Sequence, residues 1–565
     1  MRVVFERDVP CTLRDGIILR ANVYRPDEGG PYPVILTRLP YGKDGSAYSV
    51  LDPIRLAEAG YIVVIQDVRG CFASDGEFQG FPQEFNDGYD AVEWAAHLPN
   101  ANDTVGMYGV SYYGYTQWAA AAMKPPSLRV VAPTIALDDG WLGATFRHGA
   151  IEWGMTASWF SGMAVANLFK VKEQFEDFPA RFGRLVYDND RLSHEGYFDL
   201  PLDQFGALRR AGVLPDFFEQ ITRTRYDDTW RAMSIKPHYD QMDVAAFLTG
   251  GWYDVFLQST LDAYLALQQN GKEARLLIGP WSHINFTGAV GDVEFGAAAD
   301  IGFLNFEMDR TMLHRRFFDH TLKQPDPGLE QEPPVRLFVM GSNTWRYASA
   351  WPLPETTYTP YYLHSESTLS TTTPTLEPAD HYTYDPLNPV ITTGGNLLMT
   401  PSYRPGPLDQ ATVEARDDVL VYTSAPLEEA LTVIGPVKAR LFVSTTAQDT
   451  DFVVRLTDVD PSGRSLNLAD GIVRMRYRDS LEHPSLLEPN HIYAIEVDLW
   501  ATANVFLPGH CIRVQITSSN FPRWSRNLNT GESNESTAET IVATQTILHD
   551  EKHPSHLLLP VIPLA

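Results

Sequence analysis

The alternation of short apolar segments with helix-like segments in the first 135 residues constrains the fold of this chain more than any other feature. The apolar segments are "PVILTRL", "YIVVIQDV", "TVGMYG" and "LRVVAPTIA", and they alternate with "IRLAEAG", "DGYDAVEWAAHL" and an alanine-rich run. Such alternation predicts a parallel sheet that is covered by helices on both faces. Before it, apolar and polar residues alternate around Asp15-Gly16, which predicts an antiparallel hairpin.

This alternation of strand-like and helix-like segments is interrupted once and then ends. Residues 141–240 are aromatic and helical in pattern, which predicts an inserted helical cap, and the α/β rhythm resumes over 241–350. Across 351–565, Thr, Ser and Pro become dense and strand-like runs recur at short intervals, which predicts a β-sandwich or jelly roll. We therefore predict an α/β domain formed by 1–140 and 241–350, a cap formed by 141–240 and a β domain formed by 351–565.

Charge and cysteine content exclude several classes of protein. The net charge of -27 argues against partners such as nucleic acid or an anionic membrane surface, both of which attract cationic proteins. The three cysteines are scattered and form no CxxC pair, so neither a metal site nor a disulfide framework is predicted. The N-terminus lacks the pattern of a secretory signal and no apolar run is long enough to span a membrane, so we expect a cytoplasmic protein.

One serine lies where a predicted strand meets a predicted helix, in "TVGMYGVSYYGYTQWAAAAM". A serine hydroxyl becomes a useful nucleophile when a sharp turn holds it out of the backbone beside a base, and such a turn needs small neighbours. Gly109 meets that need two residues before Ser111, but Tyr113 stands where the second glycine is usual, and Gly114 follows it. The alternative is an ordinary strand-helix connection with an incidental serine.

Two later strand ends supply the partners that such a serine requires. Asp254 follows the apolar run in "AFLTGGWYDVF", and His283 follows the next run in "RLLIGPWSH". The chain order Ser, Asp, His is that of α/β-hydrolases, in which His acts as the base and Asp orients it. The pattern predicts a triad of Ser111, Asp254 and His283, although most of the 15 histidines in the chain are expected to be structural.

An acyl-transfer site also needs two donors for the developing oxyanion. The backbone N–H of Tyr112, directly after the serine, is one candidate. The loop "RLPYGK" after the strand at 33–39 has no glycine run, but its Tyr41 offers a phenolic O–H. Ordinary burial of Tyr41 is an equally good interpretation from composition alone.

Several stretches identify a resemblance. "VVIQDVRGCFASDGEF", "GMYGVSYYGYTQWAA", "GWYDVF", "GPWSHINFTG", "DGIVRMRYR" and "NVFLPGH" resemble the bacterial cocaine esterase (CocE/NonD) and X-Pro dipeptidyl-peptidase (S15) family of serine hydrolases. The resemblance implies an α/β-hydrolase core with an inserted helical cap and a C-terminal jelly roll. It also implies an acyl-enzyme, no cofactor or metal, and a homodimer. The roles of nucleophile, acid and base carry over to Ser111, Asp254 and His283, and those of oxyanion donors to Tyr41 and Tyr112.

The resemblance further implies an aromatic pocket for the acyl group. Phe256 matches the aromatic residue beside the acid. The start of the cap matches less well, so that Thr145 or Phe146 and Trp159 or Phe160 stand near the expected tryptophans, and we choose Phe146 and Trp159. These assignments predict a serine carboxylesterase that hydrolyses small esters with apolar or aromatic acyl groups.

Alternatives stay open at this point. An X-Pro dipeptidyl-peptidase or an α-amino-acid ester hydrolase/acylase would bind a free amine, for which Asp138 and Asp139 are candidates, although such a pair more often caps a helix. A catalytically silent sugar-binding protein is the third possibility. Asp67 and Arg69 are expected to pair with each other beneath the site, and "TDVDPSG" is expected to be a surface hairpin rather than a calcium loop.

Overall fold

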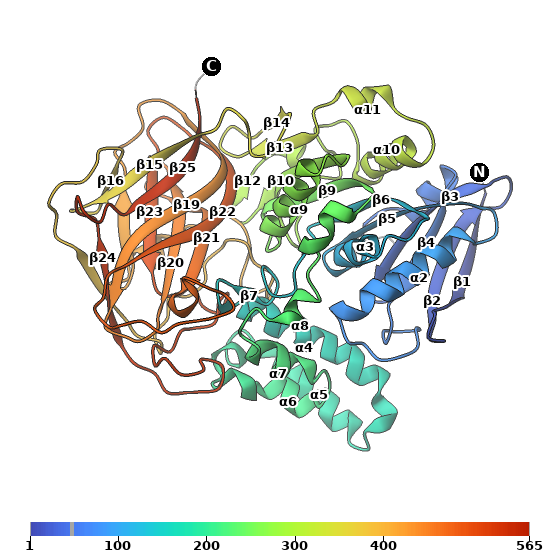
Figure 1. Ribbon diagram of the computed structural model, residues 1–565, viewed down its shortest axis with the longest axis horizontal. Helices are drawn as coiled ribbons and strands as arrows, with labels where there is room; N and C mark the ends of the chain where they lie inside the picture. The colour runs from blue at the N-terminus through green and yellow to red at the C-terminus, as the bar shows by residue number, and fades with distance from the viewer. Residues whose placement is uncertain (1, 46–49, 564–565) are drawn as a thin grey trace.

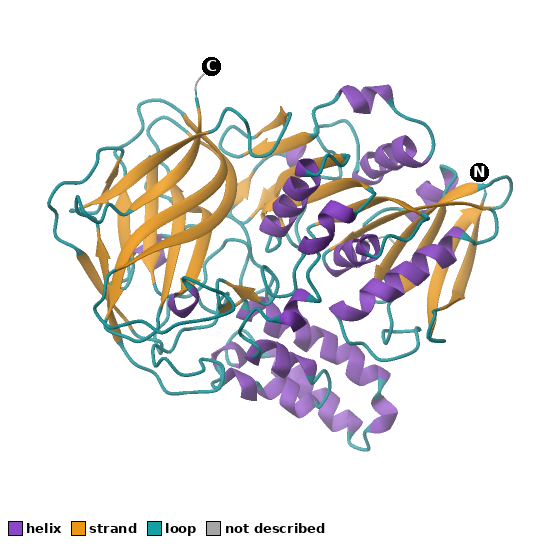
Figure 2. Cartoon of the chain, in the orientation of Figure 1, coloured by secondary structure: helices purple, strands orange, loops and turns teal. Residues whose placement is uncertain are grey.

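Two large β-sheets and a group of helices make up most of the molecule (Figures 1 and 2). The computed structural model describes residues 2–45 and 50–563, so the predicted domain ends at residues 1 and 565 lie outside the described residues. The N-terminal α/β part and the β-rich C-terminal part lie side by side, and the helices of the cap lie below their junction in Figure 1. The predicted mixed α/β architecture with a separate β-rich domain is confirmed.

The first sheet has ten strands in the order β1-β2-β4-β3-β5-β6-β9-β10-β13-β14. From β4 to β13 neighbouring strands are parallel, whereas β1 and β2 at one edge and β14 at the other pair antiparallel. The predicted hairpin around Asp15-Gly16 is the β1-β2 pair. The bounds are β1 (Val3–Thr12), β2 (Ile18–Pro26), β3 (Tyr32–Leu39), β4 (Ile62–Asp67), β5 (Ala101–Val110), β6 (Leu128–Thr134), β9 (Ala245–Tyr253), β10 (Ala274–Ser282), β13 (Val335–Val339) and β14 (Thr344–Ala348).

Helices cover both faces of this sheet because alternate residues of its strands point to opposite sides. Ile35 of β3 packs in one apolar cluster with Phe317, whereas Leu36 packs in another with Trp118. Thus α1 and α10 lie on one face, and α2, α3 and α9 on the other. Their bounds are α1 (Pro53–Glu58), α2 (Glu84–Ala96), α3 (Tyr112–Ala122), α9 (Leu257–Gln269) and α10 (Arg310–Leu322), and a short α11 (Pro327–Gln331) follows.

The cap is inserted between β6 and β9. Its longest helix, α4, begins directly after a small hairpin of β7 and β8, and it runs toward the tip of the cap (Figure 1). Ala150 of that hairpin packs with Val453 and Trp524 of the C-terminal domain, which fixes the base of the cap. The bounds are β7 (Phe146–Arg147), β8 (Ala150–Ile151), α4 (Trp153–Lys170), α5 (Phe178–Asp190), α6 (Gly206–Ala211), α7 (Asp216–Thr222) and α8 (Asp228–Arg231).

The C-terminal domain is built mainly from antiparallel strands, of which β19 and β22 form the longest pair. The segment "TDVDPSG" turns between β20 and β21 with Asp460 accepting hydrogen bonds from the N–H groups of Ser462 and Arg464, so the predicted hairpin is confirmed. The jelly-roll connectivity stays a prediction. The bounds are β15 (Thr357–His364), β16 (Thr368–Ser370), β17 (Asp380–Tyr384), α12 (Ala411–Glu414), β18 (Leu420–Thr423), β19 (Leu431–Thr445), β20 (Asp451–Val459), β21 (Ser465–Arg474), β22 (Tyr493–Phe506), β23 (Cys511–Thr517), β24 (Ala543–Leu548) and β25 (His556–Ile562).

Backbone hydrogen bonds connect the two sheets. The N–H of Met340, just after β13, donates to the carbonyl of Ala503 in β22, and the N–H of Val505 donates back to Met340. The C-terminal domain is thereby held against the end of the first sheet at which β9, β10 and β13 terminate. The loops that follow those strands are consequently packed between domains.

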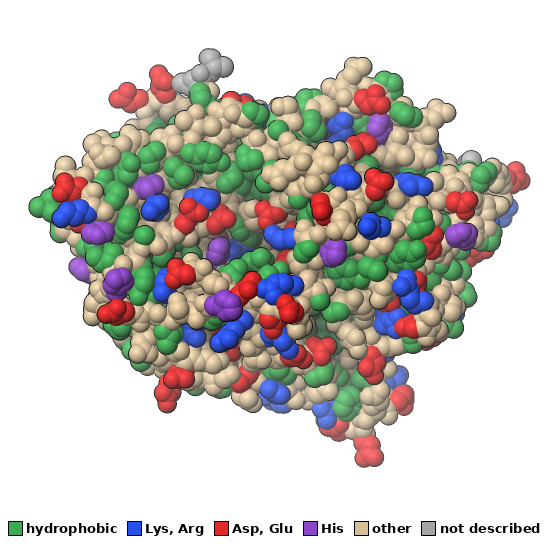
Figure 3. All heavy atoms as spheres, in the orientation of Figure 1, with side chains coloured by type: hydrophobic (Ala, Val, Ile, Leu, Met, Phe, Trp, Pro, Cys, Tyr) green, Lys and Arg blue, Asp and Glu red, His purple; other side chains and the backbone are tan. Residues whose placement is uncertain are grey.

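On the face seen in Figure 3, basic and acidic side chains alternate over both domains, with small hydrophobic areas between them. Within residues 2–45 and 50–563, no helix is long and apolar enough to cross a membrane, and no three His, Cys, Asp or Glu side chains gather as metal ligands would.

Candidate active site

Ser111 occupies the sharp turn between β5 and α3. Its backbone has φ 56° and ψ -126°, a conformation that a residue with a side chain rarely adopts, and its N–H donates to the carbonyl of Thr134. Strain of this kind persists where the surrounding structure holds it, and it presents the serine side chain at the edge of the sheet. The strand-turn-helix arrangement expected of a nucleophile is therefore present.

The small neighbours of Ser111 are required by close contacts. A Cβ at Gly109 would lie 2.5 Å from the carbonyl oxygen of Tyr113, and one at Gly114 would lie 2.5 Å from the Cβ of Ala136. Both distances are too short for any side chain. Gly114 thus permits the close approach of α3 to the segment after β6, even though it stands one position later than the usual second glycine.

The structure brings Ser111, His283 and Asp254 together. Nε2 of His283 lies 2.9 Å from the Ser111 hydroxyl, and Nδ1 of His283 lies 2.7 Å from a carboxylate oxygen of Asp254. The three residues follow β5, β10 and β9, whose carboxyl ends meet at one edge of the sheet. The geometry is that of a serine, base and acid relay.

The acid is held by a residue that the sequence analysis missed. The second carboxylate oxygen of Asp254 accepts a hydrogen bond from the N–H of Phe256 at 3.0 Å. The side-chain amide of Asn396, from the C-terminal domain, donates to the backbone carbonyls of Trp252 and Asp254 at 2.9 Å each. No local pattern around Asn396 signals this contact, because it depends on the packing of two domains.

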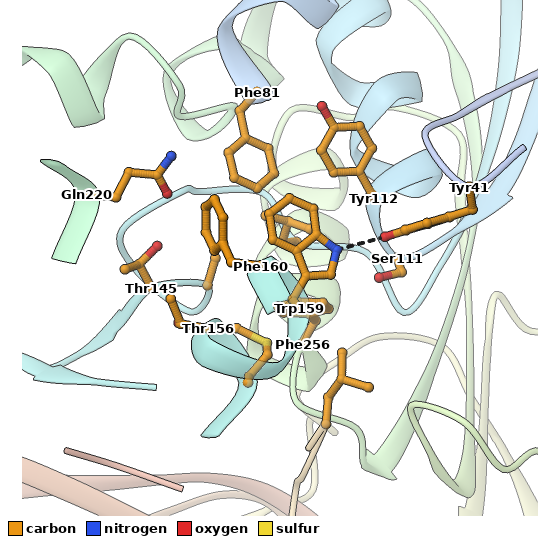
Figure 4. Close-up of a pocket in the computed structure, with 14 residues that line it drawn as sticks. Tyr41, Phe81, Ser111, Tyr112, Thr145, Thr156, Trp159, Phe160, Gln220 and Phe256 are labelled. Carbon is orange, nitrogen blue, oxygen red and sulfur yellow. Dashed lines mark hydrogen bonds between the residues drawn. The ribbon is translucent and has the colours of Figure 1, made fainter. Parts of the chain in front are cut away.

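Tyr41 and Tyr112 lie beside Ser111, where the oxyanion donors were expected (Figure 4). Tyr112 begins α3, and the first N–H groups of a helix have no partner within the helix, so this N–H is available to a ligand. Burial raises the pKa of the Tyr41 phenol, so its hydroxyl keeps its proton and can donate. The indole Nε1 of Trp159 lies 3.1 Å from the Tyr41 hydroxyl oxygen.

The predicted ion pair between Asp67 and Arg69 is wrong. Asp67 accepts the N–H of Lys43, and Arg69 pairs with other carboxylates.

A different buried ion pair, Arg38 with Glu84, supports the start of α3. The guanidinium of Arg38 lies 2.8 Å from Glu84, and both side chains are fully buried.

The other carboxylate oxygen of Glu84 accepts the hydroxyl of Tyr112 at 3.1 Å. Burial raises the pKa of Glu84, and the Arg38 guanidinium opposes that rise.

An apolar cavity opens at Ser111. Its volume is about 50 Å³, which indicates a narrow pocket. Among the described residues that line it, none is acidic or basic. The lining residues are Tyr41, Phe81, Ser111, Tyr112, Leu137, Ala144, Thr145, Met155, Thr156, Trp159, Phe160, Gln220, Phe256 and Leu398 (Figure 4).

Of the residues predicted to bind substrate, Trp159 and Phe256 line this cavity and Phe146 does not. Phe146 is fully buried, with its ring stacked on Trp141 at 5.0 Å between centroids. Thr145 lies in the turn that precedes β7 and lines the cavity together with Ala144, whereas Phe146 begins β7 and packs in the core at the base of the cap. The choice of Phe146 over Thr145 is therefore wrong.

Asp138 and Asp139 are buried away from the cavity. Asp139 accepts the N–H groups of Trp141 and Leu142 and the hydroxyl of Tyr226, so it caps a turn rather than a helix. Asp138 accepts the hydroxyl of Tyr239. Neither carboxylate lines the cavity at Ser111, and this arrangement does not offer an amine site there.

A second and larger cavity shares Tyr41 with the first. Its volume is about 850 Å³, and it lies along the later turns of α4 between the loops that follow β3 and β4. Phe72 and Phe169 line it, and each is more than half exposed. It contains no residue of the Ser111, His283 and Asp254 relay.

Comparisons with known proteins agree with this geometry. The family model of X-Pro dipeptidyl-peptidase (S15 family) matches residues 15–285, and that of the X-Pro dipeptidyl-peptidase C-terminal non-catalytic domain matches residues 327–558. Cocaine esterase from Rhodococcus sp. (strain MB1 Bresler) is 39% identical over 98% of each chain. Two solved structures, an α-amino acid ester hydrolase and an aminopeptidase from a marine sediment archaeon (Thaumarchaeota), are each 25% identical and cover 99% of this chain and 96% of theirs, with TM-scores of 0.82 and 0.81.

Proposed function

The chain belongs to the cocaine esterase and X-Pro dipeptidyl-peptidase (S15) family of serine hydrolases, and we propose that it is a carboxylesterase for small esters with an apolar or aromatic acyl group. The observation that carries this proposal is an uncharged, largely apolar cavity that opens at a serine hydrogen-bonded to a histidine.

In the proposed mechanism, the oxygen of Ser111 attacks the ester carbonyl while His283 takes the serine proton on Nε2. The negative oxygen that forms is stabilised by the hydroxyl of Tyr41 and the N–H of Tyr112. His283 then gives its proton to the departing alcohol, and the acyl group stays on Ser111. A water molecule, deprotonated by the same histidine, releases the carboxylic acid and restores the serine.

The lining of the cavity favours the esterase over the related peptidase and amino-acid ester hydrolase activities. Those activities require a substrate whose free ammonium is near the reacting carbonyl, and burying an ammonium in an apolar cavity without a carboxylate is costly. The described residues around the cavity supply aromatic rings, aliphatic groups, hydroxyl groups and the side-chain amide of Gln220, but no carboxylate. The transfer of an apolar acyl group from water to such walls, in contrast, is favourable.

A panel of chromogenic esters with acetyl, butyryl and benzoyl groups, assayed with wild type and Ser111→Ala, tests the proposal. We expect hydrolysis that depends on Ser111 and a kcat/KM that rises with the apolar area of the acyl group until the pocket is filled. Equal rates in wild type and Ser111→Ala would refute the esterase. A matched pair of N-blocked and free-amine aminoacyl esters separates the alternatives, because preference for the free amine would favour an amino-acid ester hydrolase or peptidase.

Other expectations rest on the same proposal. A cytoplasmic location, the homodimer and the absence of nucleic acid and membrane partners stay predictions. The first is checked by fractionation of cells that express the protein, and the second by its mass in solution.

A further inference from the structure

The hydrogen bond between Trp159 and Tyr41 joins the cap to the expected oxyanion site. Trp159 lies on α4, and Tyr41 lies on the loop after β3, 118 residues earlier. The indole nitrogen lies 3.1 Å from the phenol oxygen, and both side chains line the cavity that contains Ser111 (Figure 4). From the sequence, Trp159 is expected only to bind the acyl group.

The chemistry of the two groups fixes the direction of this bond. An indole N–H can only donate, whereas a phenol oxygen both donates one hydrogen and accepts. In the Trp159–Tyr41 contact the phenol oxygen is therefore the acceptor. The phenol hydrogen lies near the plane of its ring. It cannot point toward the indole N–H, because that N–H donates to the same oxygen. The O–H of Tyr41 is left to point away from Trp159.

Trp159 is itself held by neighbouring rings. It stacks nearly parallel on Tyr112 and Phe81, with interplanar angles of 17° and 16°, and meets the edge of Phe160 at 4.8 Å between centroids. Tyr41 meets the ring of Tyr113 edge to face at 5.9 Å. The donor and the acceptor are thus both fixed before a substrate is present, which is the condition for stabilising charge without reorganisation.

We propose that Trp159 is a positioning residue for the oxyanion site: its indole N–H orients the Tyr41 hydroxyl so that the phenol hydrogen faces the oxygen of the tetrahedral intermediate. The bond also withdraws electron density from the phenol oxygen and strengthens its O–H as a donor. This inference rests on the proposed esterase function. Beyond that function, the inference assigns the cap a part in stabilising the transition state as well as in enclosing the acyl group.

Replacement of the indole N–H alone tests the inference. Trp159→Phe keeps an aromatic ring and removes the donor, and incorporation of benzothienylalanine at position 159 replaces the N–H by sulfur with almost no change of shape. We expect kcat to fall about 10-fold in both variants with little change in KM, since part of one oxyanion interaction is lost. An apolar boronic acid, whose tetrahedral Ser111 adduct places an oxygen in the oxyanion site, should bind more weakly to the same extent.

Two comparisons distinguish this role from simple packing. In a Tyr41→Phe background, removal of the indole N–H should have no further effect on kcat, because the hydroxyl that it orients is gone. Phe160→Leu changes the same wall without a hydrogen bond to Tyr41, and its effect should fall on KM and add to that of Tyr41→Phe.

The inference is overturned if the benzothienylalanine enzyme retains the kcat and boronate affinity of wild type, or if its effect adds fully to that of Tyr41→Phe. Failure of the esterase proposal has a different signature, namely hydrolysis that does not depend on Ser111.

Discussion

The side-chain amide of Asn396 lies 2.9 Å from the backbone carbonyl of Asp254, from which it is separated by 142 residues in the chain. The same amide donates to the carbonyl of Trp252, so one residue of the C-terminal domain holds the end of β9 and the acid that follows it. The C-terminal domain is thus part of the support of the candidate active site, although the relay itself lies in the α/β domain.

Asn396→Ala is expected to lower kcat by roughly 10-fold, because the acid then orients His283 less firmly. Loss of the amide also removes two buried hydrogen bonds and leaves the carbonyl of Asp254 with the N–H of Leu257 as its donor, which should lower the free energy of unfolding by about 1–3 kcal/mol. Ester hydrolysis and urea denaturation measure the two effects. Thr393→Ala, on the same segment, removes a hydroxyl that donates to the nearby carbonyl of Ile391; it is the control and should change neither. A folded Asn396→Ala enzyme with wild-type kcat would contradict this role.

Gly114→Ala tests the close approach of α3 to the segment after β6. The new Cβ would lie 2.5 Å from that of Ala136, so the helix must shift, at a cost of about 1–3 kcal/mol in the free energy of unfolding. Because Ser111 precedes this helix directly, kcat should fall as well. A Cβ added at Gly162 on α4 would meet no atom within 4 Å, so Gly162→Ala should stabilise the protein by about 0.5–1 kcal/mol. Equal melting temperatures for the two variants would refute the steric argument.

Asp138 makes stability depend on pH. Burial raises its pKa to about 7, well above the usual value of 3.8, and Lys236 opposes this rise only in part. At pH values between 3.8 and about 7, the carboxyl of Asp138 is protonated in the folded state but ionised in the unfolded state. The contribution of Asp138 to stability is therefore lost as the pH rises through this range. Asp138→Asn should therefore stabilise the protein by roughly 1–4 kcal/mol at pH 8 and have little effect at pH 4.

Urea denaturation of wild type and Asp138→Asn at both pH values measures this difference. The fully exposed Asp243 provides the control, since Asp243→Asn should give the same small change at each pH. A stabilisation by Asp138→Asn that is independent of pH would show that the buried carboxyl does not titrate in this range.

The buried pair of Arg38 and Glu84 gives a further test. Glu84→Gln leaves the fully buried guanidinium without its carboxylate, and such a loss typically costs about 3–5 kcal/mol. Glu496→Gln, which breaks the exposed pair with Lys438, should cost less than about 1 kcal/mol. Thermal unfolding of both variants would measure the contrast, and similar melting temperatures would contradict the importance of the buried pair.

Local sequence patterns were sufficient for much of the architecture. Apolar periodicity distinguished the strands and helices of the α/β part, because the burial of one face imposes that period on each element. The order of Ser111, Asp254 and His283, each directly after an apolar strand, predicted their meeting, because parallel strands end at the same edge of a sheet. The structure places their side chains within hydrogen-bond distance.

Side-chain partners between distant segments could not be obtained in this way. Asp67 and Arg69 are close in sequence yet bind different partners, and Thr145 rather than its neighbour Phe146 reaches the cavity. Thr145 lies in a turn and Phe146 begins a two-residue strand, and no periodic pattern in so short a segment predicts which side chain faces the cavity.

The sequence by itself determined the order of the elements and the strand ends that carry the reacting groups, because both follow from the burial pattern of contiguous residues. Only the tertiary structure decided which side chains surround those groups: the bond from Trp159 to Tyr41, the support of Asp254 by Asn396 and the ion pair of Arg38 with Glu84. Each joins segments that are remote in the chain. Its existence depends on how separate elements and domains pack against one another, which periodicity and spacing do not encode.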